Sequence, residues 1–62
     1  MSAKWTKTPK VGAWALHRSG ELDSRRVAEV LEIEGEKYVK LQFWGQVGGP
    51  FPASNYMYRE DS

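Results

Sequence analysis

Few side chains in this chain belong to the types that carry out nucleophilic, acid–base or metal chemistry. There is no cysteine among the 62 residues, and the single histidine is His17. Disulfides, thiolate zinc sites and histidine-rich metal sites are therefore excluded. Four glutamates raise the question of paired carboxylates or a cation site: Glu29, Glu32, Glu34 and Glu36. We interpret them as the solvated surface of a β-hairpin, and the sequence predicts no metal site.

The remaining candidates for catalysis are equally weak. The stretch "GQVGG", from Gly45 to Gly49, lacks the lysine and the strand–loop–helix setting of a phosphate loop, so its glycines are expected to turn the chain. We expect His17 to lie exposed at the end of a strand, where its charged form would contact a phosphate or an acidic partner. The sequence thus predicts a protein that is not an enzyme and needs no cofactor.

Basic side chains offer a different chemistry, that of binding. The net charge is only +1, but residues 1–26 hold six basic groups against two acidic ones, whereas residues 27–62 hold three against six. Such asymmetry marks an interaction face in some proteins, although small soluble domains often divide charge this way. The candidate residues for contacting nucleic-acid phosphates are Lys4, Lys7, Lys10, Arg18, Arg25, Arg26 and Lys40.

Aromatic side chains divide between a core and a surface. Phe43 alternates with Val39 and Leu41, which assigns it to the core, whereas Trp44 lies on the opposite face with Lys40. Exposed aromatic rings beside lysines stack on bases or bind peptides, and the alternative for Trp44 is that it covers an end of the domain. The candidate surface patch comprises Trp14, Trp44, Phe51, Tyr56 and Tyr58.

The elements that position these side chains are predicted to be short strands. Apolar and polar residues alternate over 31–34 and again over 38–44, and Gly35 supplies a turn between them, which predicts a hairpin. The alternation breaks between Val30 and Leu31, where a β-bulge would restore the phase. A helix capped by Asp23 or Ser24 is the alternative for the segment before the turn.

The rest of the chain completes an all-β prediction. "VGAWALHR" reads as a strand, "GQVGGP" as a loop or a second hairpin turn, and Phe51 between two prolines as part of an edge strand. "PASNY" suggests a 3₁₀ turn before the last strand. We therefore expect a small five-stranded barrel over residues 11–62, preceded by a flexible basic arm over residues 1–10. Trp5 in this arm either folds back onto the domain or contacts a partner.

Four segments resemble the SH3-like barrel superfamily, and most closely its Royal group of Tudor, PWWP and chromo-barrel domains. They are "KVGAWAL", "RRVAEVLEI", "YVKLQFWGQ" and "ASNYMYRED", and they span roughly residues 10–61. "GPFPASNY" is similar to the closing motif of SH3 domains, with one extra residue between Pro52 and Tyr56. The Royal-group resemblance implies a binding module, in which three or four aromatic rings would have to converge to hold a methylated lysine.

These observations lead to one expected function and two alternatives. We expect a non-enzymatic module that recognises nucleic acid, or a protein associated with nucleic acid or chromatin, as a monomer or weak homo-oligomer. The first alternative is a protein–protein adaptor or accessory subunit, and the second is a small barrel enzyme that is active only as an oligomer. No uncharged run approaches the roughly 20 residues of a membrane span, so a cytoplasmic, nucleoid or nuclear location is expected.

Overall fold

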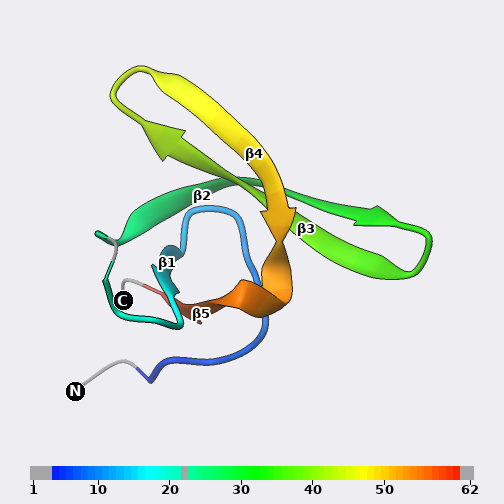
Figure 1. Ribbon diagram of the computed structural model, residues 1–62, viewed down its shortest axis with the longest axis horizontal. Helices are drawn as coiled ribbons and strands as arrows, with labels where there is room; N and C mark the ends of the chain where they lie inside the picture. Colours follow the sequence, from blue (N-terminus) through cyan, green and yellow to red (C-terminus); the bar gives the residue numbers. More distant parts are fainter. Residues whose placement is uncertain (1–3, 22, 61–62) are drawn as a thin grey trace.

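A computed structural model describes residues 4–21 and 23–60. In this part of the chain there are five strands and one short 3₁₀ helix, and no helix is long and apolar enough to cross a membrane. The elements are β1 (Trp14–His17), β2 (Arg25–Ile33), β3 (Glu36–Phe43), β4 (Gln46–Pro52), η1 (Ala53–Asn55) and β5 (Tyr56–Arg59) (Figure 1). The expected all-β fold, with five strands and a 3₁₀ turn before the last one, is confirmed.

All strand pairs are antiparallel, and the strand order is β4-β3-β2-β1-β5. Neighbours in this order are also neighbours in sequence, except that β5 returns to pair with β1. Figure 1 shows the β2–β3 and β3–β4 hairpins extending away from a compact end that β1, η1 and β5 build. The last strand therefore closes this compact end against the first.

The segment before Gly35 is a strand, so the alternative helix is wrong. β2 pairs with β3 from Val27 to Ile33, and the bulge lies between Val27 and Glu29. This is earlier than the break that the sequence pattern suggested. Val27 is buried and Val30 packs against the core, which requires one extra residue between them because a regular strand turns residues three apart to opposite faces.

The second hairpin turn is tighter than the sequence suggested. It is confined to Trp44 and Gly45, and β4 already begins at Gln46, so the expectation that "GQVGG" as a whole forms the turn is wrong. The pairing of β4 with β3 is irregular between Val39 and Leu41, next to the stretch of β4 that contains Gly49. β4 lies at one end of the strand order, which confirms the edge position expected for Phe51.

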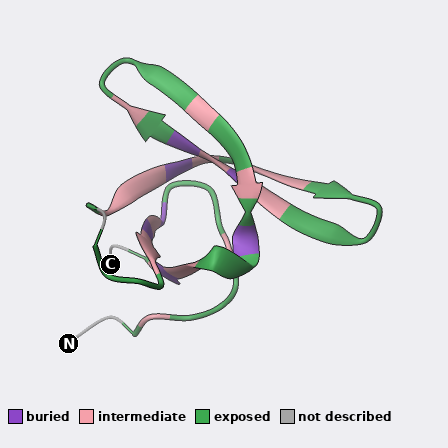
Figure 2. Cartoon of the chain, viewed as in Figure 1, coloured by how far each residue is buried: buried purple, intermediate pink, exposed green. Residues whose placement is uncertain are grey.

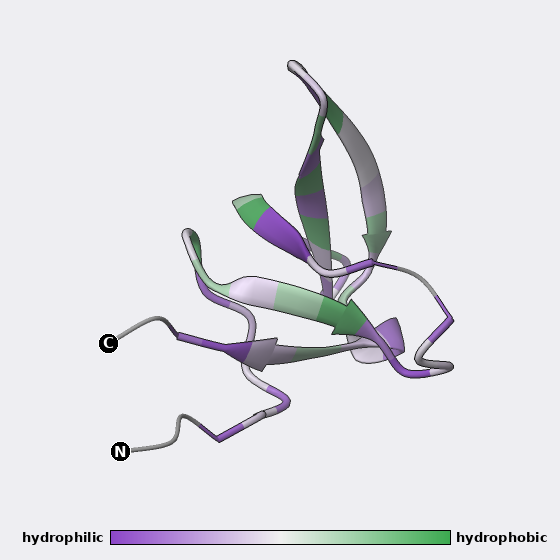
Figure 3. Cartoon of the chain, turned by 90° about the vertical axis from the view of Figure 1, so that its left-hand side faces the viewer, coloured by the Kyte–Doolittle hydropathy of each residue, from purple (hydrophilic) through white to green (hydrophobic). Residues whose placement is uncertain are grey.

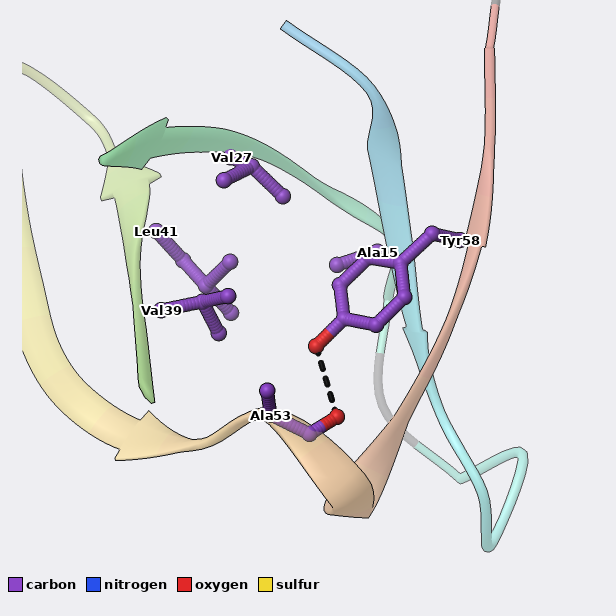
Figure 4. Packing of buried hydrophobic residues seen from close by; sticks show 6 residues of the cluster. All are labelled: Ala15, Val27, Val39, Leu41, Ala53 and Tyr58. Atoms are coloured by element: carbon purple, nitrogen blue, oxygen red, sulfur yellow. Dashed lines mark hydrogen bonds between the residues drawn. The ribbon is translucent and has the colours of Figure 1, made fainter. Parts of the chain in front are cut away.

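The core is small and lies where the strands cross. Figure 2 shows buried segments on β2 and β3 near this crossing and on β1 and η1 beside it, whereas the tips of both hairpins are exposed. The buried hydrophobic residues are Ala13, Ala15, Val27, Val39, Leu41, Ala53 and Tyr58. Phe43, assigned to the core from its alternation, packs against this cluster while staying half-buried. Figure 4 shows the valine and leucine side chains of β2 and β3 facing Ala15 and the ring of Tyr58.

Tyr58 is the largest fully buried side chain among the described residues. Its ring is 1% exposed, and its hydroxyl donates a hydrogen bond of 2.7 Å to the carbonyl oxygen of Ala53 in η1 (Figure 4). Burial, and to a lesser degree the nearby Tyr56, raises the pKa of Tyr58 from the ordinary 10.0 to about 12. Tyr58 thus ties the 3₁₀ turn to the last strand from inside the core.

This buried phenol predicts that the protein loses stability in alkali. The folded pKa is above the unfolded one, so the stabilisation is complete below about pH 10 and is lost as the pH rises from about 10 to about 12. We expect the free energy of unfolding, measured by urea titration, to fall across this window. Tyr58→Phe lacks the ionisable group and should show a shallower fall, and an equal fall in both proteins would contradict the assignment.

The segment before β1 is attached to the outer edge of β5. The backbone N–H of Thr6 donates to the carbonyl of Tyr58 at 2.7 Å, and the N–H of Tyr58 donates back to Thr6 at 2.8 Å. Next to this bridge, the guanidinium of Arg59 lies 4.9 Å from the centre of the Trp5 ring. Trp5 therefore lies against β5. We call residues 4–10 the arm; the division of the chain at residue 10 stays a prediction.

Candidate functional site

Three basic side chains from separate parts of the chain line one groove of about 310 Å³, which we call the Lys7 groove. Lys7 comes from the arm, Arg18 from the turn after β1, and Lys37 from the start of β3. Tyr56 and Met57 at the start of β5 supply an aromatic and an apolar wall. The groove therefore combines positive charge with surface on which a flat or apolar group can pack.

Backbone contacts hold these basic residues in place. The N–H of Arg18 donates to the carbonyl of Asn55 at 3.0 Å, and its guanidinium reaches the carbonyl of Ser54 at 3.4 Å. Lys7 follows directly after the bridge between Thr6 and Tyr58. Lys37 is fixed by the hairpin, where its backbone pairs with Glu32. Backbone contacts thus anchor all three residues at the groove.

The electrostatic balance of the Lys7 groove is positive. Glu36 is the one acidic residue in its lining, against three basic ones. Among the described residues, no ion pair involves Lys7 or Lys37, and both are exposed. The other described acids of the β2–β3 hairpin and of the loop after β1 are outside this lining: Glu21, Asp23, Glu29, Glu32 and Glu34. An anionic ligand could therefore bind these two lysines without breaking an ion pair among the described residues.

A second groove, of about 460 Å³, lies on the other side of the arm, and we call it the Lys10 groove. Its basic residues are Lys4, Lys10 and Arg59, and Glu60 is its one acidic residue. Lys10 and Glu60 form an ion pair whose side chains are 66% and 62% exposed. Exposed pairs of this kind contribute little to stability, so Lys10 can exchange this partner for another anion.

Three of the expected phosphate-binding residues lie in other environments. Arg25 stacks on the rings of Phe43 and Trp44, at 4.8 and 4.3 Å from their centres. Arg26 lies 4.2 Å from the centre of the Trp14 ring and donates to the carbonyl of Gly12. The Lys40 ammonium is 3.9 Å from a carboxylate oxygen of Glu29. The structure therefore divides the seven expected residues instead of gathering them on one surface.

The expected aromatic patch is not one surface, and Tyr58 does not belong to any surface because it is buried. Trp44 is 85% exposed, which confirms that it points outward. Phe51 and Tyr56 pack against the core, with their ring centres 6.3 Å apart. Trp14 is half-buried beneath Arg26. Of the five expected rings, Tyr58 is buried, three are half-buried, and Trp44 alone is exposed.

Trp44 and the arm lie at opposite ends of the molecule. Figures 1 and 3 place the β3–β4 turn, which holds Trp44, far from the N-terminal segment in two perpendicular views. One ligand of a few nucleotides therefore does not contact Trp44 and the Lys7 groove together. The expected combination of basic arm and outward tryptophan separates into two surfaces.

His17 lies beside the Lys7 groove rather than in it. It ends β1, as expected, but it is half-buried, because its ring meets Tyr56 edge-on at 5.2 Å between centres. Its Nδ1 atom is 2.8 Å from the hydroxyl of Ser19. No group of three or more metal-ligating side chains is found within residues 4–21 and 23–60.

The structure adds Lys37 and Arg59 to the residues that the sequence singled out. Lys37 follows two glutamates in "EGEK", so a count of charge by segment does not single it out. It comes next to the arm only through the β2–β3 hairpin. Arg59 follows "YMY" near the end of the chain, where nothing in the spacing signals a site. Both grooves lie between the arm and β5, so they could have been predicted only from the long-range pairing of Thr6 with Tyr58.

No family model matches the chain, and comparisons with curated proteins and with solved structures also gave no match. The resemblance to SH3-like and Royal-group domains therefore stays a prediction. The grooves and the side chains that line them are the basis for inferring function.

Proposed function

We propose that the chain is a small non-enzymatic module that binds nucleic acid through the Lys7 groove. The observation that carries this proposal is the convergence of Lys7, Arg18 and Lys37 on one concave surface. These residues are far apart in sequence, so no local charge run explains their meeting. A location in the nucleoid or nucleus would follow from this function.

The chemistry of the groove suits a phosphodiester backbone. The planar guanidinium of Arg18 can donate two parallel hydrogen bonds to one phosphate, and the lysines act as point charges. Tyr56 and Met57 beside them offer surface for a base or a sugar. Because the whole chain carries a net charge of only +1, we expect moderate affinity that decreases steeply with salt.

An NMR titration of the ¹⁵N-labelled protein tests this proposal. A short single strand and a short duplex are added in turn at low and at moderate salt. We expect amide shifts at Lys7, Arg18, Lys37 and Tyr56 that weaken as salt rises. The absence of shifts with both nucleic acids at low salt would overturn the proposal.

A double variant, Lys7→Ala with Lys37→Ala, measures how many phosphate contacts the groove makes. For a single strand, each lost contact lowers the slope of log K against log salt by about 0.7, so the slope should lose about 1.4. Fluorescence anisotropy with a labelled oligonucleotide gives this slope. Both lysines are exposed and free of ion pairs among the described residues, so the variant should keep its stability.

Two control variants locate the contact. Lys40→Ala removes a lysine that pairs with Glu29, and it should bind like the wild type. Trp44→Ala removes the exposed ring at the opposite end, and it should also bind normally. If Trp44→Ala abolishes binding while the double variant does not, the nucleic acid contacts the β3–β4 turn and the assignment to the Lys7 groove is wrong.

The exposure of Trp44 favours a second candidate function, a protein-interaction module. A tryptophan that is 85% exposed and stacked on an arginine has the character of an interface hot spot. Its partner would bind with little salt dependence. In that case Trp44→Ala would abolish capture of the partner protein, whereas the double variant of Lys7 and Lys37 would not affect it.

A further inference from the structure

We infer that the ligand is a single strand that crosses the arm, with one part of its backbone in the Lys7 groove and the next part in the Lys10 groove. This inference rests on the proposed function and specifies its ligand. It goes beyond the Lys7 groove because it assigns a role to the second groove and to the arm itself.

The arm forms the common wall of the two grooves. Lys7 and Pro9 line the Lys7 groove, whereas Thr6, Thr8 and Lys10 line the Lys10 groove. This alternation is that of an extended chain, whose successive side chains point to opposite sides. A ligand that leaves one groove over the arm therefore enters the other directly.

Both grooves present the same charge pattern to such a ligand. Each has three basic residues and one glutamate in its lining, and in the Lys10 groove these are Lys4, Lys10, Arg59 and Glu60. Arg59 stacks on Trp5, and Lys10 makes its exposed pair with Glu60. A phosphate at Lys10 would replace a carboxylate that costs little to release. The positive charge thus continues across the arm.

The size and the walls of the grooves favour a single strand over a duplex. Volumes of about 310 and 460 Å³ are those of sites for small molecules, in the range of one or two nucleotides. A duplex keeps its bases stacked inside and offers only its backbone, whereas a single strand can place a base against Tyr56 or Met57. Of the two ligands, only the single strand offers an unpaired base to the apolar wall between the charges.

The test compares short and long deoxythymidine oligomers. A dinucleotide fills the Lys7 groove alone, whereas an oligomer of about twelve nucleotides also reaches the Lys10 groove. The double variant Lys4→Ala with Lys10→Ala should bind the dinucleotide like the wild type. For the long oligomer it should lower the slope of log K against log salt by about 1.4. The variant of Lys7 and Lys37 should weaken binding of both oligomers.

A further variant separates binding from structure at the Lys10–Glu60 pair. Glu60→Gln breaks the same ion pair as Lys10→Ala but removes a negative charge from the groove. It should bind the long oligomer more tightly than the wild type. If Glu60→Gln and the Lys4/Lys10 variant both weaken binding, the pair supports the arm and the second groove is not a phosphate site, which overturns the inference.

Other outcomes distinguish the inference from the proposed function. A duplex of equal length that binds tighter than the single strand would overturn the crossing strand and leave the Lys7 groove as a nucleic-acid site. An unchanged salt slope in the Lys4/Lys10 variant would have the same meaning, provided that the Lys7/Lys37 variant still loses binding. If neither oligomer nor the duplex binds at low salt, the proposed function itself fails.

Discussion

Tyr58→Ala is expected to remove a large part of the protein's free energy of unfolding. Truncation of a buried aromatic side chain costs about 3–5 kcal/mol, and Tyr58 is 1% exposed. A chain of 62 residues has a total stability of roughly 3–9 kcal/mol at the usual 0.05–0.15 kcal/mol per residue. The single substitution therefore removes a large part of the whole. Urea unfolding followed by tryptophan fluorescence measures the loss.

Two further substitutions identify the source of this loss. Tyr58→Phe keeps the ring but leaves the carbonyl of Ala53 without its buried donor, so it should cost about 1–3 kcal/mol. Trp44→Ala removes a larger but exposed ring and its stacking on Arg25, which should cost about 1 kcal/mol or less. If Trp44→Ala destabilises the protein as much as Tyr58→Ala, the core does not centre on Tyr58.

The contrast between these two aromatic residues shows what the sequence could predict. Trp44 directly follows the eight-residue strand β3, whose alternation, continued by one residue, assigned it to the face opposite Phe43. Tyr58 belongs to the four-residue strand "YMYR", in which Tyr56 and Tyr58 share a face and nothing local decides which of them is covered. Tyr58 is buried because β1 pairs with it on one side and Thr6 on the other. Those pairings are long-range and leave no local pattern.

The β2–β3 hairpin and its turn were predictable for a similar reason. Gly35 has a φ of 81° and directly precedes β3, and a glycine between two alternating runs is a local signal. The bulge near Ala28 was misplaced because the pattern beyond Val30 belongs to the projecting part of the hairpin. There Ile33 is 48% exposed, so apolar alternation no longer reports the side of the core.

The candidate site was predictable only in its kinds of residue. Counting charge by segment selected Lys7 and Arg18, which line the Lys7 groove, but it also selected Arg25, which lines neither groove and stacks on aromatic rings instead. The same count missed Lys37, which an acidic hairpin carries to the arm. Charge along the chain therefore reported the amount of basic surface, whereas the pairing of strands determined its location.

Gly49→Ala is expected to destabilise the protein by about 3 kcal/mol. Gly49 has a φ of +117°, which side chains rarely adopt, and an added Cβ would lie 2.9 Å from the carbonyl oxygen of Val39. Val39 is fully buried in β3, so its carbonyl cannot move aside. The contact is relieved only if β4 shifts away from β3. The strained backbone and the overpacking each cost about 1–3 kcal/mol. The measurement is the midpoint and slope of urea unfolding.

Gly45→Ala is the matched control, because it separates backbone strain from steric contact. Gly45 also has a positive φ, of +85°, but an added Cβ there meets nothing within 4 Å. Its cost should be that of the backbone alone, about 1–2 kcal/mol. Equal losses at the two glycines would mean that β4 can yield at Val39 without disturbing the core. A larger loss at Gly49 would show that the close approach of β4 to β3 matters for packing, because this approach holds Phe51 against the core. Phe51 in turn packs on Tyr56, which is the aromatic wall of the Lys7 groove.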